Sequence, residues 1–354
     1  MNKFRKPKAD GDVCNGMFVG MDVHKNYLQV AVLDEKGKVL NNSRVDNDLA
    51  KVNEFFDSLH PNSKTKVVME SSGMWYKIYE CLSKRHLDVR LSNPVKTRAI
   101  ASAKIKTDKL DAVKLADLLR GGYIAECYVP NKRIMGLRDI VRHRAALVRM
   151  RTKLKNKVHG ITVMKGIDHD ASEVERTGTF TKRHMDRLEE EFDDYRINGC
   201  LRVIKSLNNE VNTVSKKILL LAKEDEIAKL LMTIPGVGYY SALLIISEVG
   251  DISRFPDSYH LCSYAGLVPS THSSGGVTRY GSSITKAGSK YLRWIMLECV
   301  HAHIRSEKKS NIAQFYYRIA RKKGNSKAAV AAAAKLLKVV YWIMKERRTY
   351  ERLG

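Results

Sequence analysis

Strand-like segments are confined to the first third of this 354-residue chain. Short apolar runs bounded by turn residues predict strands at residues 18–23, 27–33, 39–40, 67–70 and 89–91. Helical spacing of apolar residues marks 48–59, a segment opening at Ser71-Ser72-Gly73, and 108–119. Strands joined by tight turns and then alternating with helices predict a mixed sheet, so we expect an α/β N-terminal domain.

The rest of the chain carries helical patterns and no strand signal. Apolar residues recur at helical spacing from Ile134 to Leu154. Steps of 4, 3, 4 and 3 form a short heptad seam at Leu207, Val211, Val214, Ile218 and Leu221. Two long helices fit best, as an antiparallel or an intermolecular coiled coil, and ordinary burial in a helical domain explains the seam equally well. From residue 230 onward we expect a mainly α domain with Gly- and Ser-rich loops.

These patterns divide the chain into four segments, which are a basic extension at 1–16, an α/β domain at 17–130, a helical linker at 131–229 and a C-terminal domain at 230–354. No apolar run approaches the roughly 18 to 20 residues of a membrane helix. Polar residues 10–15 stand where a signal peptide needs its apolar core. The six cysteines form no CxxC pair, so neither a zinc site nor a disulfide framework is expected, and the chain reads as cytoplasmic.

The charge of the chain favours a polyanionic partner. Lys and Arg number 63 against 38 Asp and Glu, a net charge of +25, and nucleic acid is the commonest polyanion. Ten Lys/Arg and one acid lie between Lys132 and Lys157, which predicts a face that binds a phosphate backbone with steep salt dependence. The residues expected to bind there are Arg138, Arg142, Arg144, Arg149, Arg151 and Lys155.

Four carboxylates lie at strand ends or at a helix start, where they are candidate metal ligands. Asp22 and Glu70 each end a predicted strand, and Asp108 and Asp111 share one face of a helix near its N-terminus. If the strands are neighbours and the helix packs beside them, all four carboxylates converge. Because clustered carboxylates repel one another, such a site requires hard cations. Two Mg²⁺ ions, roughly 3.5 to 4 Å apart, would activate the attacking oxygen and stabilise the leaving oxygen of a phosphodiester. The alternative is that these acids are ordinary caps and solubilising groups.

Two glycine-containing segments are candidate phosphate contacts. Residues 234–238 resemble the hairpin of a helix-hairpin-helix motif, in which Gly236 and Gly238 let backbone N–H groups approach a phosphate. A plain helix connection is the alternative. Residues 270–276 place serines before paired glycines, ahead of Arg279 and Lys286, as in an exposed nucleophile or an anion-binding loop, unless they form a flexible linker.

Taken together, these motifs resemble one family, the DEDD transposases of bacterial insertion sequences known as the insertion-sequence-110 family. The resemblance begins at Met17 and covers nearly the whole chain. The matching motifs are GMDVHK at 20–25, MESSG at 69–73, KTDKLDA at 106–112, PGVG at 235–238, GDISRF at 250–255, AGLVP at 265–269, SGG at 274–276 and ITKAG at 284–288. The basic N-terminal extension and the duplicated serine at 273 and 274 depart from the family pattern.

The resemblance implies a RuvC-like, RNase H-type domain at 17–130, a coiled-coil linker at 131–229 that assembles dimers and tetramers, and a transposase domain at 230–354. It implies that Asp22, Glu70, Asp108 and Asp111 bind magnesium and that Ser274 is the nucleophile, with Ser273 as the alternative. It also implies a structured noncoding guide RNA that pairs with donor and target DNA, and action at the nucleoid. The hypothesis is a composite site in which the serine forms a covalent phosphoserine link to DNA.

Three other classes remain in view. A RuvC-like junction nuclease would use the same acids with water as nucleophile and leave free 5′-phosphate products. A sugar-kinase or actin-like ATPase shares the ancestral sheet, but further glycine-rich nucleotide loops are missing from the sequence. A non-catalytic nucleic-acid-binding protein with a decayed site is the third, and the presence of all four acids argues against it.

Overall fold

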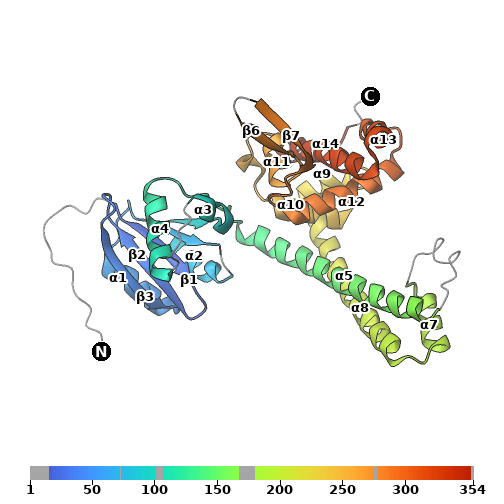
Figure 1. Ribbon diagram of the computed structural model, residues 1–354, viewed down its shortest axis with the longest axis horizontal. Helices are drawn as coiled ribbons and strands as arrows, with labels where there is room; N and C mark the ends of the chain where they lie inside the picture. Colours follow the sequence, from blue (N-terminus) through green and yellow to red (C-terminus); the bar gives the residue numbers. More distant parts are fainter. Residues whose placement is uncertain (1–15, 72, 101–106, 167–179, 275–276, 352–354) are drawn as a thin grey trace. The chain divides into compact units, whose positions relative to one another are not determined.

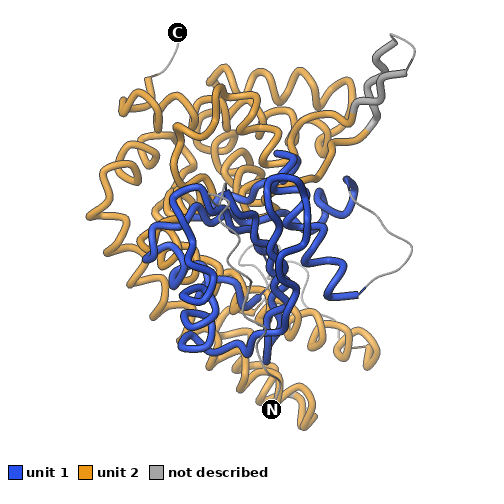
Figure 2. The backbone as a smooth tube through the Cα atoms, turned by 90° about the vertical axis from the view of Figure 1, so that its left-hand side faces the viewer, with its two compact units in different colours: residues 1–129 blue, residues 130–354 orange. Residues whose placement is uncertain are grey.

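The computed structural model describes residues 16–71, 73–100, 107–166, 180–274 and 277–351, without the side chains of residues 191, 271–274 and 277–282. The chain divides into two compact units, residues 1–129 and residues 130–354 (Figure 2). Apart from Gly16, the basic extension expected at 1–16 lies outside the described residues. No helix in the described ranges is long and apolar enough to cross a membrane.

The first unit contains a five-stranded mixed sheet in the order β3-β2-β1-β4-β5 (Figure 1). Its antiparallel half consists of β1 (Phe18–Val23), β2 (Tyr27–Leu33) and β3 (Val39–Asp46). Its parallel half joins β1 to β4 (Lys66–Glu70) and β5 (Asp88–Ser92). The expected mixed α/β sheet is confirmed, and it is consistent with an RNase H-like domain.

One face of this sheet is covered by α1 (Leu49–Leu59) and α2 (Trp75–Ser83). Val19, Met21 and Val23 of β1 are buried there in one apolar cluster with side chains of both helices. The opposite face is covered by α4 (Asp108–Arg120), and α3 (Pro94–Ile100), which the sequence did not predict, follows β5. Because alternate residues of a strand face opposite sides, Gly20 and Asp22 point toward the α4 face.

Gly20 allows α4 to lie directly on β1. A Cβ atom at this position would be 2.1 Å from the carbonyl oxygen of Ala112 and 2.5 Å from the amide nitrogen of Ala116. Both alanines are fully buried, so the helix and the strand meet almost backbone to backbone. This contact fixes the distance between the start of α4 and the end of β1, where the candidate acids lie.

Replacing Gly20 with alanine is therefore expected to destabilise the first unit by about 3 kcal/mol, the upper end of the usual cost of overpacking. The added methyl group meets backbone atoms, which cannot rotate away. The measurement is urea unfolding of the full chain, with Gly73→Ala as the control because a Cβ at Gly73 meets nothing within 4 Å. A loss below about 0.5 kcal/mol for Gly20→Ala would contradict the close approach.

The second unit begins with an antiparallel pair of long helices, α5 (Lys132–Met164) and α8 (Tyr195–Glu224), with α7 (Lys182–Glu191) beside their far end (Figure 1). Contacts that advance along α5 go backward along α8: Arg144 donates to Ser215 at 2.7 Å and Arg151 to Asn208 at 2.9 Å. Val211 and Ile218 of the heptad seam are buried within the chain. The seam thus packs inside one chain, as both the antiparallel pair and ordinary burial in a helical domain predict.

The core of the second unit is mainly helical, as expected. Its helices are α9 (Glu226–Met232), α10 (Tyr239–Val249), the short 3-10 helix η1 (Ile252–Arg254), α11 (Ser258–Tyr264), α12 (Lys290–Ser306), α13 (Asn311–Lys323) and α14 (Asn325–Glu346). α10 is buried along most of its length, and α14 packs against α11, α12 and α13. These helices support the one sheet described in this unit.

That sheet is a hairpin of β6 (Pro269–Ser274) and β7 (Val277–Ile284), where the sequence predicted a loop. The loop prediction is wrong for the backbone. Ser, Thr and Gly dominate both strands, so the apolar alternation that signals a strand is missing, and the pairing rests on backbone hydrogen bonds.

Candidate active site

Three elements of the first unit bring the predicted acids to one end of the sheet. β1 and β4 are parallel with Met21 opposite Met69, so Asp22 and Glu70 occupy the next positions on adjacent strands. Val68, two residues before Glu70, packs on α4, so Glu70 faces the same side as Asp22. Asp108 and Asp111 lie in the first turn of α4 on that face. The fold therefore places all four acids at the same end of the sheet, and their shared role as metal ligands stays a prediction.

The structure adds His24 to this group. Its Nε2 atom lies 3.1 Å from Oδ2 of Asp22 and 3.5 Å from Oδ2 of Asp108. One ligand atom from each of these three residues lies within 4.8 Å of the others, a grouping that could hold a metal ion. No role was predicted for His24 from the sequence. The feature that points to it is its position two residues after Asp22.

Two further side chains orient the cluster. The hydroxyl of Tyr27 donates to Oδ2 of Asp108 at 2.7 Å, and its ring stacks on His24 with centroids 4.7 Å apart. Lys114 Nζ lies 3.2 Å from Oδ1 of Asp111, one turn along the same helix. Tyr27 was not predicted as a site residue.

The surroundings of Asp22 disfavour the ionised form of its carboxyl group. Burial raises the pKa of Asp22, His24 works against this rise, and the negative charges of Asp108 and Asp111 add to it. The hydrogen bond to Asp108 likewise raises the pKa of the Tyr27 hydroxyl. Carboxylate oxygens at this density suit a hard divalent cation, which would relieve their repulsion. The carboxylate oxygens therefore fit a hard divalent cation.

The predicted nucleophile lies on the hairpin of the second unit. In the pairing of β6 and β7, Ser274 is opposite Val277 and Ser273 is opposite Thr278. The side chains of both serines and of Arg279 lie outside the described part.

The base of the hairpin is locked onto the helical core. A Cβ atom on Gly288 would lie 2.0 Å from the carbonyl oxygen of Tyr264, and one on Gly266 would lie 2.3 Å from that of Ala287. Thr285 also donates its N–H to the carbonyl of Val268 at 3.0 Å. The chain on either side of the hairpin is thus held by direct backbone contact.

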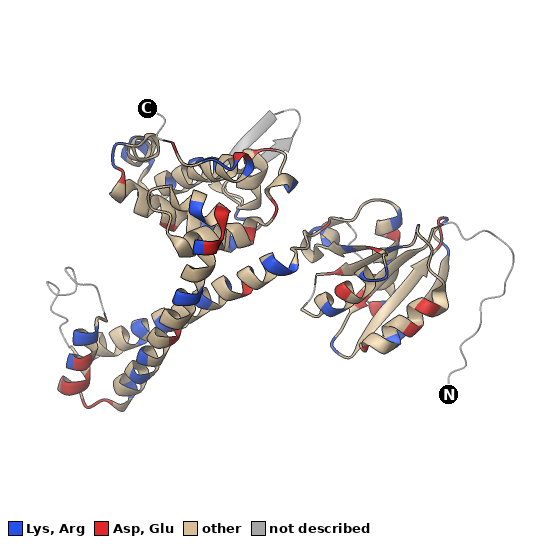
Figure 3. Cartoon of the chain, turned by 180° about the vertical axis from the view of Figure 1, so that it is seen from behind, with Lys and Arg blue, Asp and Glu red and all other residues tan. Residues whose placement is uncertain are grey.

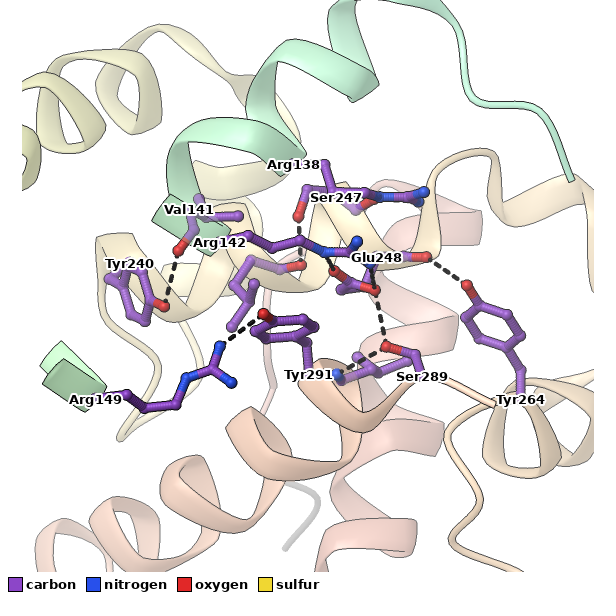
Figure 4. A network of polar contacts seen from close by, with 12 residues as sticks. Arg138, Val141, Arg142, Arg149, Tyr240, Ser247, Glu248, Tyr264, Ser289 and Tyr291 are labelled. Carbon is purple, nitrogen blue, oxygen red and sulfur yellow. Dashed lines mark hydrogen bonds and ion pairs between the residues drawn. The ribbon is translucent and has the colours of Figure 1, made fainter. Parts of the chain in front are cut away.

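A buried carboxylate connects this base to α5 (Figure 4). Glu248 of α10 is 1% exposed and accepts from Arg142 Nε at 2.8 Å and Nη2 at 3.0 Å. Ser289, which caps α12, donates to Oε2 of Glu248 at 2.8 Å, the oxygen that also accepts from Arg142 Nη2. Arg138 donates twice to the carbonyl of Ser247, at 2.7 and 3.0 Å. Two arginines predicted to bind phosphate therefore hold α5 against α10.

The other predicted basic residues of α5 also have partners within the chain. Arg144 lies over the ring of Tyr240, Arg149 donates to the Tyr291 hydroxyl at 2.6 Å, and Lys155 lies over the ring of Phe180. Figure 3 shows further Lys and Arg along both α5 and α8. The contacts of this segment with nucleic acid stay a prediction, and the packing contacts explain much of its arginine content.

The two partners of the buried ion pair should respond unequally to substitution. Arg142→Ala leaves the carboxylate of Glu248 buried without its guanidinium, for an expected loss of about 3 kcal/mol or more. Glu248→Gln leaves Arg142, whose side chain is 39% exposed and regains water, so the expected loss is about 1 to 2 kcal/mol. Chemical unfolding of the two variants, with exposed Arg202→Ala as control, checks the order, and a larger loss for Glu248→Gln would contradict it.

The predicted hairpin glycines differ in their surroundings. Gly236 has a φ of +89°, and a Cβ there would lie 2.5 Å from the amide nitrogen of His303, so the packing of α12 requires glycine. His303 is fully buried and bonds the carbonyl of Pro235 at 2.7 Å and the hydroxyl of Ser310 at 2.8 Å. Gly238 is the N-cap of α10, and a Cβ there meets nothing within 4 Å. Phosphate binding at these glycines stays a prediction.

Carboxylates at the ends of adjacent strands and on a covering helix define a DEDD nuclease-like domain, a class that depends on divalent metal. Residues 19–166 match the DEDD transposase model of the IS110 group, described as "Transposase", and residues 228–317 match "Transposase IS116/IS110/IS902 family". The chain belongs to this IS110 family of DEDD transposases, which are enzymes of DNA recombination.

The similar proteins carry names from the same activity. The chain is 25% identical to the transposase for insertion sequence element IS1111A of Coxiella burnetii, over 94% of this chain and 90% of that protein. It is 24% identical to the IS1328 transposase of Yersinia enterocolitica, over 95% and 98%. It is also 24% identical to the pilin gene-inverting protein of Moraxella bovis, again over 95% and 98%.

Proposed function

We propose that this transposase cuts and rejoins DNA through a serine nucleophile, with metal-binding acids in its first unit. Ser274 is the proposed nucleophile, and Asp22, Glu70, Asp108 and Asp111 are the proposed magnesium ligands, two ions to a site. The grouping of Asp22, His24 and Asp108 carries the proposal, because three potential ligand atoms within 4.8 Å of one another make sense as a cation site.

The chemistry conserves one phosphodiester bond at each step. The hydroxyl oxygen of Ser274 attacks phosphorus, the bond from phosphorus to a deoxyribose oxygen breaks, and the serine proton ends on that leaving hydroxyl. A hydroxyl of another DNA strand then attacks the phosphoserine and releases the serine. Bound divalent metal supplies Lewis-acid stabilisation of the charge on the oxygens. In the first unit, His24 and Tyr27 hold Asp22 and Asp108 in place for that role.

The proposal includes the partners that the family resemblance implies. These are donor and target DNA, a structured noncoding RNA that guides the protein to both, and a homodimer that assembles to a tetramer at the nucleoid. The net charge of +25 supports a nucleic-acid partner. The name of the Moraxella bovis relative, a gene-inverting protein, supports rejoining as well as cutting.

A junction nuclease that uses water is the second candidate, because the acid cluster of the first unit would suffice for it. The two functions give different products. The test incubates the full chain with Mg²⁺, RNA transcribed from the noncoding sequence beside the gene, and end-labelled DNA. A labelled protein–DNA adduct that survives denaturing electrophoresis is expected. Cleavage to free 5′-phosphate ends without any adduct would favour the nuclease.

A further inference from the structure

The cations around the last two helices differ from those of α5. The arginines of α5 bind carboxylate, carbonyl, hydroxyl and amide groups within the chain. Among the described residues, no carboxylate forms an ion pair with any of seven cations near α13, α14 and the end of β7, and two of these cations, Arg318 and Lys335, lie over the ring of Phe315. These are Lys286, Arg318, Arg321, Lys322, Lys323, Lys327 and Lys335.

These seven cations line two surface grooves that meet at Arg318. One groove, of about 540 Å³, runs between the end of β7 and the α13–α14 junction and takes in Lys286, Lys322, Lys323 and Lys327. The other, of about 490 Å³, lies along α13 and takes in Arg321 and Lys335. Neither groove is lined by an acidic residue.

The lining is amphipathic in a way that suits a nucleic-acid strand. Ile284, Ile319 and Val330 give the first groove an aliphatic floor beneath its lysines. Phe315 and Tyr317 lie among the cations of the second groove, and Tyr317 is 40% exposed. Lysine and arginine heads bind phosphates, while sugars and bases pack on apolar and aromatic surface.

We propose that these joined grooves form a DNA-binding surface that holds the strand beside the hairpin; this inference rests on the proposed function. From Asn311 to Lys323, α13 is about 18 Å long, which matches roughly five phosphate spacings along one strand. DNA is favoured over an acidic protein because Arg318, Arg321 and Lys322 recur at three- and four-residue spacing along α13 and the chain is a transposase. All but Lys286 lie beyond residue 317, where the family match ends.

The surface lies close to the proposed nucleophile along the hairpin. β7 leads from Val277, which is opposite Ser274, to Ile284 in the first groove. The seven residue steps from Val277 to Ile284 span about 23 Å, which is less than one turn of B-DNA. A strand held in the grooves is therefore within one helical turn of the start of β7.

The test is the salt dependence of DNA binding by the full chain. Lys322→Gln/Lys323→Gln removes two groove cations, and Lys216→Gln/Lys223→Gln removes two exposed lysines of α8 as the matched control. Affinity for a fluorescent 30-base-pair duplex is measured from about 0.05 to 0.3 M salt, with an RNA of equal length in parallel. Each lost phosphate contact should lower the slope of log K against log salt by about 0.9, which is roughly fivefold in affinity at 0.15 M.

The groove variant should therefore lose about two units of slope and roughly 30-fold in affinity for DNA, while the control matches the parent protein. Equal melting temperatures exclude unfolding as the cause. An unchanged DNA slope in the groove variant, whatever happens to the RNA slope, overturns the surface. Adduct formation by the parent chain is scored separately, so the surface can fail while the serine chemistry stands, and the reverse.

Discussion

Replacing Asp22 with asparagine is expected to lower DNA strand cleavage by about 10³-fold. The substitution keeps the shape of the side chain and removes one anionic ligand from the centre of the acid cluster, next to His24 and Asp108. Loss of metal-dependent transition-state stabilisation worth about 4 kcal/mol corresponds to that factor. The measurement is the rate of appearance of cleaved labelled DNA under single-turnover conditions with Mg²⁺.

Stability separates this loss from misfolding. Burial and the neighbouring acids raise the pKa of Asp22, so its ionised form is less favourable in the folded chain than in the unfolded chain. The asparagine variant should therefore be at least as stable as the parent near neutral pH in a chelator, where a raised carboxyl pKa costs stability. Asp57→Asn, at an exposed site of the same unit, is the control. Full cleavage by Asp22→Asn would count against the metal site.

Replacing Ser274 with alanine is expected to abolish the protein–DNA adduct and strand rejoining. Alanine removes the hydroxyl oxygen that forms the covalent bond in the proposed reaction. DNA binding should survive, because the substitution changes no charge. The measurement is the yield of adduct on a denaturing gel beside the yield of rejoined product.

Ser273→Ala is the matched control for this experiment. It removes one hydroxyl at the adjacent position of the chain and should retain adduct formation within about tenfold. The reverse result, with an adduct from Ser274→Ala and none from Ser273→Ala, would assign the nucleophile to Ser273. A protein–DNA adduct from both variants would contradict the assignment of a serine nucleophile at either position.

The sheet of the first unit was predictable because its inner strands are strongly apolar. β1, β2 and β4 appear in the sequence within one residue of their observed bounds. β3 extends to Asp46, well past the predicted residues 39–40, because it is an edge strand whose second half is polar. The strands of the hairpin β6–β7 were not predicted for a related reason, because their Ser, Thr and Gly residues give no apolar alternation.

The candidate site was predictable in its acids and less so in their neighbours. Acids at strand ends and at a helix start indicate where a sheet edge gathers charge, but nothing in the spacing says that Gly20 brings α4 onto β1. His24 and Tyr27 carry no pattern of their own and are identified by distance alone. The basic run of α5 was visible in the sequence, but its role was not. The density of Lys and Arg does not show whether an arginine contacts a phosphate or a buried carboxylate such as that of Glu248.

The most direct test of the proposed serine mechanism is the identity of the residue joined to DNA. The full chain is incubated with Mg²⁺, guide RNA and duplex DNA, the adduct is digested with protease and nuclease, and the modified peptide is sequenced by mass spectrometry. A nucleotide linked through phosphate to Ser274 is the expected result. A phosphate link to a residue other than Ser274, or complete cleavage with no peptide carrying a nucleotide, would contradict it.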